Sequence, residues 1–302
     1  MYRSIDKMNL SIRGYFMWKR KLINTDRGQF EIFTQGTGKP LCTTHLYSEF
    51  NEMGSYFADT FINHFKVVLI NLKDAGNSCK AETEEELSMK ESSKDLEAIR
   101  EALNYDKWCF AGHSTGGMLG LVYATMYPDS LTKLLVGGAT ANNKYMEHEG
   151  SMYSLKSPLN KRLLEIFSIL KSTDSTLEDR RKANKEWSDM SLHNPARRDE
   201  YFQKPSSGKV VQSRLDYYSN MDLPYYDIQR ELKQVTIPTF VYCGRYDAQC
   251  PLVFSEEINT GLINSKLYVF EKSNHIPYLE EKEIFLEMVC NFKELTDKTF
   301  SY

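Results

Sequence analysis

The sequence predicts an α/β fold with a mostly parallel central sheet, flanked by helices and interrupted by a helical insertion. Short β-rich runs alternate with helical patterns from Gln29 to Asn142 and again from Val235 onward. This is the order that βαβ units give when they stack into a parallel sheet. Between these stretches the chain is rich in charge and tyrosine and has few β-like runs. A chain of 302 residues is long enough to bury a substantial core.

Short apolar runs indicate the strands, and 3.6-residue periodicity indicates the helices. The strand runs are GQFEIFTQG from Gly28, PLCTTH from Pro40, FKVVLINL from Phe65, KWCFAGH from Lys107, LTKLLVGGA from Leu131, VTIPTFVYCG from Val235 and SKLYVFEKS from Ser265. Ser92 or Ser93 is expected to cap a helix that buries Leu96 and Ile99. Further helices are predicted over 115–127 and in the last stretch, where apolar residues from Ile284 to Leu295 share one face.

The change in composition divides the chain into two parts. Residues 1–140 and 232–302 are expected to form one α/β core domain, and residues 141–231 a helical insertion within it. NKRLLEIFSILK is the clearest amphipathic helix of the insertion, and TLEDRRKANKEWSDM is expected to form another with a solvated charged face. No internal repeat or low-complexity linker is apparent.

Charge and cysteine spacing exclude several classes of protein. A net charge of -3 and a pI of about 6.1 give no basic field for nucleic acid or an anionic membrane. The N-terminus lacks the apolar stretch of a secretory signal, so a cytoplasmic protein is expected. The six cysteines show neither C-x-x-C nor metal-ligand spacing, which predicts free thiols and no metal site.

The stretch FAGHSTGGMLG places Ser114 in a G-x-S-x-G pattern between a predicted strand and a predicted helix. Gly112 and Gly116 lack the Cβ atoms that would clash in a tight strand-to-helix turn. Such a turn lifts Ser114 above the edge of the sheet, where the N–H of Thr115 points into the same space from a helix N-terminus. Ser114 is therefore a candidate nucleophile.

A serine hydroxyl needs a base, and that base needs an orienting acid. His275 and Asp247 each directly follow a predicted strand, so both lie at the edge of the sheet where Ser114 emerges. The order Ser, Asp, His is the one found when this triad is built on an α/β sheet. The remaining candidates are expected to have structural or surface roles: His113, His64, His148, His193 and, as a loop-ordering residue, Asp74.

With these motifs in place, the sequence resembles the α/β-hydrolase superfamily, in the branch of proline iminopeptidases and cofactor-free haloperoxidase-type esterases. The likeness spans CTTHLYSEF, DAGNS, GHSTGG, GRYDAQCP and SNHIP. It implies Ser114 as nucleophile, His275 as general base and Asp247 as its orienting acid, with the insertion as a helical cap and no metal or organic cofactor.

The resemblance also indicates how the oxyanion hole is built, with one departure from the family pattern. The family commonly has His-Gly after the third strand, whereas this chain has Leu46 after His45. Matching His45 to the family histidine makes Tyr47 the expected N–H donor beside Thr115, with Leu46 as the fallback.

The leading expectation is a serine hydrolase that cleaves a small-molecule ester or lactone through an acyl-enzyme. Aromatic residues of the insertion, and one beside Asp247, are candidate substrate contacts: Tyr145, Trp187, Tyr217, Tyr218 and Tyr246. Acidic residues such as Glu147, Glu149 or Asp216 would favour an aminopeptidase if they held a substrate amine. Carbon-carbon bond hydrolysis and a non-catalytic ligand-binding protein are the further alternatives, and the oligomeric state is left open.

Overall fold

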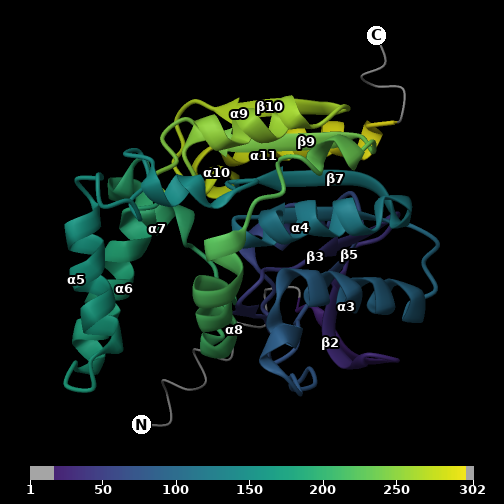
Figure 1. The fold of residues 1–302 in the computed structure, drawn as a ribbon, viewed down its shortest axis with the longest axis horizontal. Helices are drawn as coiled ribbons and strands as arrows, with labels where there is room; N and C mark the ends of the chain where they lie inside the picture. Colours follow the sequence, from purple (N-terminus) through teal and green to yellow (C-terminus); the bar gives the residue numbers. More distant parts are fainter. Residues whose placement is uncertain (1–16, 297–302) are drawn as a thin grey trace.

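A computed structural model describes residues 17–296, and its centre is an eight-stranded sheet in the order β1-β2-β5-β3-β6-β7-β9-β10 (Figure 1). The strand β2 is antiparallel to both β1 and β5, whereas all later neighbours are parallel. The strands of this sheet are β1 Lys19–Thr25, β2 Gly28–Gln35, β3 Pro40–Thr43, β5 Lys66–Ile70, β6 Trp108–His113, β7 Leu131–Gly137, β9 Thr239–Gly244 and β10 Ser265–Phe270. The predicted mostly parallel α/β sheet is confirmed.

Two core clusters lie on opposite faces of the sheet because side chains alternate along each strand. On β5, Val68 and Ile70 pack into one cluster, and Val67 and Leu69 pack into the other. The pattern explains why these strands read as continuous apolar runs in the sequence, since both faces are covered.

Helices cover both faces of the sheet (Figure 1). The helices α3 and α4 contribute Leu96 and Met118 to the first cluster, whereas α11 contributes Phe285 and Phe292 to the second. The helices outside the insertion are α2 Tyr56–Asp59, α3 Met89–Ala102, α4 Thr115–Met126, α9 Leu252–Gly261, α10 Pro277–Glu280 and α11 Lys282–Glu294.

The insertion lies between β7 and β9 and is mainly helical. Its regular elements are α5 Asn160–Lys171, α6 Leu177–Asp189, α7 Arg198–Tyr201, β8 Lys209–Val210 and α8 Gln212–Tyr217. Figure 1 shows α5 and α6 side by side at one end of the molecule, beyond the sheet. Both predicted amphipathic helices of this segment are confirmed, and Thr176 caps α6 through a capping box with Asp179.

Three local expectations were wrong or incomplete. The cap of α3 is Ser88, which accepts the N–H of Glu91, while Ser92 and Ser93 are buried inside the helix. The strand β1 was missed because KRKLINT is charged and mostly exposed, as suits an edge strand. The strand pair β4 (Ser48–Glu49) and β8 was missed because two residues carry no periodicity.

A buried hydrogen-bond network ties α3 and α4 to the strand that leads to Ser114. Trp108 of β6 donates its Nε1–H to the Tyr123 hydroxyl at 3.0 Å, and Tyr123 donates to Glu97 at 2.8 Å. Ser130 and Arg100 donate to the same carboxylate at 2.7 and 2.6 Å. The Tyr123 hydroxyl is therefore both an acceptor and a donor in the core.

The Tyr123→Phe variant is expected to lower the free energy of unfolding by about 1–3 kcal/mol, because a buried indole N–H then has no acceptor. Urea denaturation of the two proteins measures this difference. Tyr127→Phe is the matched control, since that ring packs on Tyr123 and is only half-buried. A change within about 0.5 kcal/mol is expected for the control, and equal losses in both variants would contradict the network.

Candidate active site

The turn between β6 and α4 holds Ser114 in a strained backbone conformation. Ser114 has φ 57° and ψ -131°, in a region that residues with a Cβ rarely occupy. A Cβ on Gly112 would lie 2.2 Å from the carbonyl oxygen of Gly116, and a Cβ on Gly116 would lie 2.4 Å from that of Thr44. Glycine at position 112 therefore lets the chain turn this tightly, and glycine at position 116 lets the turn after β3 approach the start of α4. The two glycines of the G-x-S-x-G pattern are thus required by close backbone contacts, as the sequence predicted.

Asp247 and His275 form a buried hydrogen-bonded pair. The Nδ1 atom of His275 lies 2.9 Å from Asp247 Oδ2 and 3.1 Å from Oδ1. Each residue is 4% exposed. Because a carboxylate only accepts, this contact places the imidazole proton on Nδ1 and leaves Nε2 as the basic nitrogen.

The loop after β9 holds the Asp247 carboxylate through its own backbone. The N–H groups of Gln249 and Cys250 donate to Asp247 Oδ1 at 2.9 and 2.8 Å. The Cys243 thiol lies 3.8 Å from Oδ2. The carboxylate therefore has a fixed direction toward the imidazole.

The loop that carries His275 is attached both to the Asp247 loop and to the insertion. Asn274 accepts the N–H of Ala248 at 2.8 Å and donates to the carbonyl of Met190 at 3.1 Å. The N–H of His275 donates to the carbonyl of Ser191 at 3.2 Å. A Cβ on Gly244 would lie 1.9 Å from the Asn274 carbonyl oxygen, so this glycine is what lets the two loops approach.

Ser114 and His275 both border the backbone at the end of β7. The N–H of Ser114 donates to the Gly137 carbonyl at 2.9 Å, and a Cβ on the next residue, Gly138, would lie 3.0 Å from the His275 ring. In the described structure, residues 17–296, no hydrogen bond joins the Ser114 hydroxyl to His275, whose Nδ1 contacts Asp247. Such contacts commonly tighten only when substrate binds.

His113 has the structural place expected for it. Its Nδ1 lies 2.9 Å from the Tyr242 hydroxyl, and its ring centroid lies 4.6 Å from that of His275. Burial lowers the pKa of His113 well below its ordinary value, so it presents a neutral ring to His275. Asp74 likewise orders a loop, since it accepts the Ala81 N–H at 3.1 Å.

The turn after β3 lies beside the start of α4. His45 Nε2 lies 3.1 Å from the Thr115 hydroxyl, and its Nδ1 lies 2.9 Å from the Ser48 hydroxyl. Burial lowers the pKa of His45 to about 3, so the bridge is neutral. The N–H of Thr115 heads α4 and has no acceptor within the helix. Leu46 and Tyr47 are thereby held close to the N-terminus of α4.

Of the five predicted substrate contacts, Tyr145 and Tyr218 lie together beside this turn. Their hydroxyls are 3.0 Å apart, and the Tyr218 ring lies 5.8 Å from that of Tyr47. Tyr153, which the prediction did not select, packs on Tyr145 and donates to the Gln249 side chain at 2.7 Å. Burial raises the pKa of Tyr47 to about 12 and that of Tyr153 well above its ordinary value, so these phenols stay neutral.

Trp187 borders a pocket of about 250 Å³ that reaches His275. The walls come from α2, α6, α10, the residue after α7 and the loops that carry Asp247 and His275, and none of the lining residues is Asp, Glu, Lys or Arg. The lining residues are Tyr56, Asn184, Trp187, Ser188, Ser191, Phe202, Gln249, His275, Ile276, Tyr278 and Leu279. The site therefore opens onto a surface of aromatic and neutral polar groups.

The other two predicted contacts lie elsewhere. Tyr217 lies near Asp222 and Glu85, and burial together with their negative charge raises the pKa of its phenol. Tyr246 is 54% exposed and stacks on His193 with 4.3 Å between ring centroids. Neither residue lines the pocket that reaches His275.

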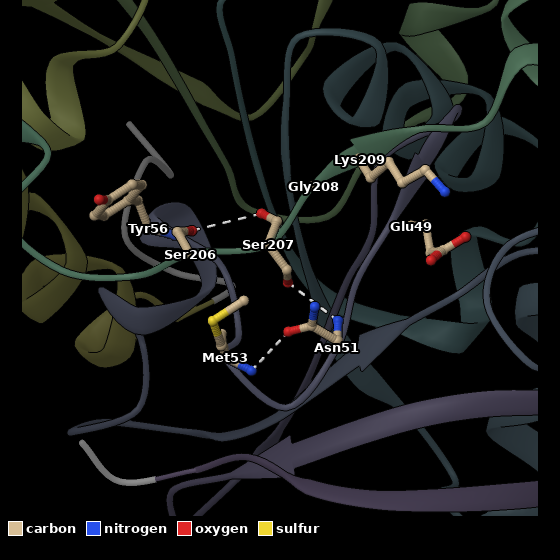
Figure 2. Close-up of a pocket in the computed structure, with 8 residues that line it drawn as sticks. All are labelled: Glu49, Asn51, Met53, Tyr56, Ser206, Ser207, Gly208 and Lys209. Atoms are coloured by element: carbon tan, nitrogen blue, oxygen red, sulfur yellow. Dashed lines mark hydrogen bonds between the residues drawn. The ribbon is translucent and has the colours of Figure 1, made fainter. Parts of the chain in front are cut away.

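A second, more open pocket of about 480 Å³ shares Tyr56 with the first (Figure 2). It lies where the loop after β4 meets the segment before β8. Ser206 accepts the N–H of Tyr56 and Ser207 accepts that of Asn51, each at 3.1 Å. Figure 2 shows Glu49 and Lys209 on one side of this pocket and Tyr56 on the other.

The acidic residues considered for amine binding are on the surface: Glu147, Glu149 and Asp216 are all exposed. Within residues 17–296 no group of histidine, cysteine and carboxylate side chains is arranged to hold a metal ion. No helix in the same part of the chain is long and apolar enough to cross a bilayer.

Sequence reasoning missed the supporting residues Gln249, Asn274 and Arg214. Gln249 lies two residues after Asp247, and Asn274 directly precedes His275. Their closeness in sequence to predicted site residues is the signal that could have identified them. Arg214 lies in a charged stretch of the insertion, and this sequence context predicts an exposed residue. Its side chain is in fact 1% exposed, and no local pattern in the sequence shows this.

Comparison with known proteins agrees with this architecture. A family model described as the alpha/beta hydrolase fold matches residues 35–282. A solved alpha/beta fold family hydrolase from Bacillus anthracis strain Sterne is 46% identical and superposes with a TM-score of 0.89, covering 91% of this chain and 99% of that one. An esterase from Exiguobacterium antarcticum is 21% identical with a TM-score of 0.67 over 91% of this chain and 99% of its own, and this likeness concerns the fold alone.

Curated relatives are similar over shorter or more divergent stretches. A proline iminopeptidase from Heyndrickxia coagulans is 27% identical over 66% of this chain and 71% of its own length. The AB hydrolase superfamily protein YisY from Bacillus subtilis is 22% identical over 85% of this chain and 92% of its own. Together with the family match over most of its length, these findings show that the chain belongs to the α/β-hydrolase family.

Proposed function

We propose that the protein is a serine hydrolase that cleaves a small-molecule ester or lactone through an acyl-enzyme on Ser114. The observation that carries the proposal is the buried pair of Asp247 and His275, with 2.9 Å between carboxylate and imidazole, beside a serine in a strained turn. This combination supplies a nucleophile and an oriented base. Residues 141–231 would act as a cap over the site.

In the first half of the reaction, His275 Nε2 takes the proton of Ser114 as Oγ attacks the substrate carbonyl. Asp247 holds the imidazole by its Nδ1–H and stabilises the imidazolium that forms. The carbonyl oxygen becomes an oxyanion, and the backbone N–H groups of Thr115 and Tyr47 are the proposed donors to it. The C–O bond to the leaving group then breaks, and His275 returns its proton to the departing alcohol.

In the second half, water replaces the alcohol. His275 takes a proton from the water as its oxygen attacks the acyl carbon, and the same N–H groups bind the second oxyanion. Collapse of this intermediate breaks the bond to Ser114 Oγ, which receives the proton from His275. The products are a carboxylic acid and the free enzyme.

The chemistry of the pocket favours a neutral substrate. Its described lining offers aromatic rings and the neutral side chains of Asn184, Ser188 and Gln249. An aminopeptidase would need an anionic partner for the substrate amine, and Glu147, Glu149 and Asp216 are exposed. Proline iminopeptidase activity, after which several relatives are named, is therefore the second candidate.

A fluorophosphonate probe is expected to label the wild-type protein and not Ser114→Ala, because phosphonylation requires the activated serine. Labelling of His275→Ala should be at least about 100-fold slower, since the base is lost. In-gel fluorescence after timed exposure measures both rates.

His148→Ala is the matched control for this experiment. His148 belongs to the insertion, and its Nδ1 accepts the N–H of Gly150 at 3.1 Å, outside the proposed site. Its labelling rate should equal that of the wild type. An unlabelled wild type, or unchanged labelling of Ser114→Ala, would refute the proposal and favour a non-catalytic protein.

Asp247→Asn is expected to lower kcat for an aryl ester by about 10³- to 10⁴-fold, because the amide no longer holds the Nδ1–H tautomer of His275. Steady-state kinetics with p-nitrophenyl acetate measures the loss, and circular dichroism checks that the variant is folded. A folded variant with less than a tenfold loss would show that Asp247 has another role.

Turnover of p-nitrophenyl acetate, γ-butyrolactone and prolyl-p-nitroanilide separates the two candidate substrate classes. The neutral pocket predicts that kcat/KM for the ester or the lactone exceeds that for the prolyl amide. A preference for prolyl-p-nitroanilide would make the aminopeptidase the better assignment.

A further inference from the structure

Arg214 of α8 is a buried cation that no step of the proposed reaction uses. Its side chain is 1% exposed, and none of the ion pairs in the described part of the chain includes it. Burial lowers its pKa to about 10, so the guanidinium still carries its charge at neutral pH. The negative charges of Asp95, Asp74 and Asp222 favour the charged guanidinium, but none of them pairs with it directly, so the buried charge also needs satisfied hydrogen bonds.

All the partners of this guanidinium are uncharged, and three of them are backbone carbonyls. The Nε–H donates to the carbonyl of Leu46. The Nη1 and Nη2 groups donate to the carbonyls of Lys73 and Leu87 at 3.1 and 3.2 Å, and Nη2 also donates to the Ser92 hydroxyl at 2.7 Å. One side chain of the insertion is thereby joined to the turn after β3, the loop after β5, the short helix that ends at Leu87, and α3.

The contact with Leu46 bears directly on the proposed oxyanion hole. The carbonyl of Leu46 and the N–H of Tyr47 belong to one planar trans peptide and point in opposite directions. A donor fixed on that carbonyl therefore fixes the direction of the N–H. It also withdraws electron density from the oxygen, which makes the N–H a stronger donor.

The same segment holds the next peptide as well. The N–H of Val211 donates to the Tyr47 carbonyl at 2.9 Å, and Ser48 pairs with Val210 in the β4 and β8 ladder. The turn after β3 is thus held on both sides of Tyr47 by residues 210–214. An unsupported turn would be free to rotate this peptide.

We propose that Arg214 is a positioning residue that sets the Leu46–Tyr47 peptide so that the Tyr47 N–H faces the oxyanion. The inference rests on the proposed function, and it assigns a role in the reaction to a residue of the insertion. Arg214 acts through the peptide and does not touch the substrate.

An NMR measurement tests the peptide independently of activity. The sequence contains two Leu-Tyr bonds, Leu46–Tyr47 and Leu267–Tyr268. Labelling leucine with ¹³C at the carbonyl and tyrosine with ¹⁵N therefore gives two correlated amide signals. In Arg214→Met, the Leu46–Tyr47 signal should shift or broaden, while the Leu267–Tyr268 signal in β10 stays in place.

Kinetics with matched oxygen and sulfur esters test the consequence. Sulfur accepts weaker hydrogen bonds than oxygen, so an oxyanion hole favours the oxoester over the thionoester. Arg214→Met is expected to lower kcat for the oxoester by about 10- to 100-fold with KM changed less than about twofold. The ratio of oxoester to thionoester rates should fall, which a mere loss of folded protein would not cause.

Two further variants complete the test. Arg214→Lys keeps a charge but can reach fewer of the carbonyls, so it should give intermediate effects, and it serves if Arg214→Met fails to fold. Ser213→Ala is the control on the same helix, because it removes a hydrogen bond to Asp74 and leaves the Leu46 contact intact. Its NMR signals and rate ratio should match the wild type.

The outcomes separate this inference from the proposed function. An active wild type whose Leu46–Tyr47 signal or rate ratio does not change in either folded Arg214 variant overturns the role of Arg214 alone. A wild type without Ser114-dependent turnover overturns the proposed function, and the oxyanion role of this peptide is then overturned with it.

Discussion

The close backbone contact between Gly112 and Gly116 is the constraint on which the rest of the site depends. A carbonyl oxygen occupies the space where a Cβ of Gly112 would be, and this lets β6 pass into α4 with Ser114 at φ 57°. The strain at this residue costs on the order of 1–3 kcal/mol. The buried strands and helices on both sides of the turn offset that cost, because the chain cannot relax without separating them. The direction of the serine is thus fixed before any substrate arrives.

The sequence predicted the sheet well because its strands are buried on both faces and read as apolar runs. Ser114, Asp247 and His275 could be chosen as candidate site residues for a related reason. Each follows such a run closely, so the topology of a parallel sheet places all three at the same edge of the sheet. The pairing of Asp247 with His275 bears this out, whereas their catalytic roles stay a proposal. The edge strand β1 lacks the apolar signal, and the two-residue β4 and β8 pair is set by tertiary contacts alone.

The insertion was harder to interpret at the level of single residues. Its helices follow a 3.6-residue pattern, which predicted α5 and α6. Which aromatic rings face the site depends on how those helices sit on the sheet, and that is a long-range property. Tyr145 and Tyr218 lie beside the turn after β3, whereas Tyr246 stacks on His193 and does not line the pocket. Arg214 shows the same limit, since a charged residue in a charged stretch gives no sign of being buried.

The strand order has a consequence for when the proposed site can form during synthesis. The residues of the proposed site come from positions between His45 and His275, so nearly all of their mutual contacts are distant in sequence. Folds dominated by such contacts have a high contact order and form slowly, because long loops must close first. His275 follows β10, the last strand of the sheet to leave the ribosome. A nascent chain therefore carries Ser114 long before it carries the proposed base, and the pair of Asp247 and His275 can form only after the final strand has been made.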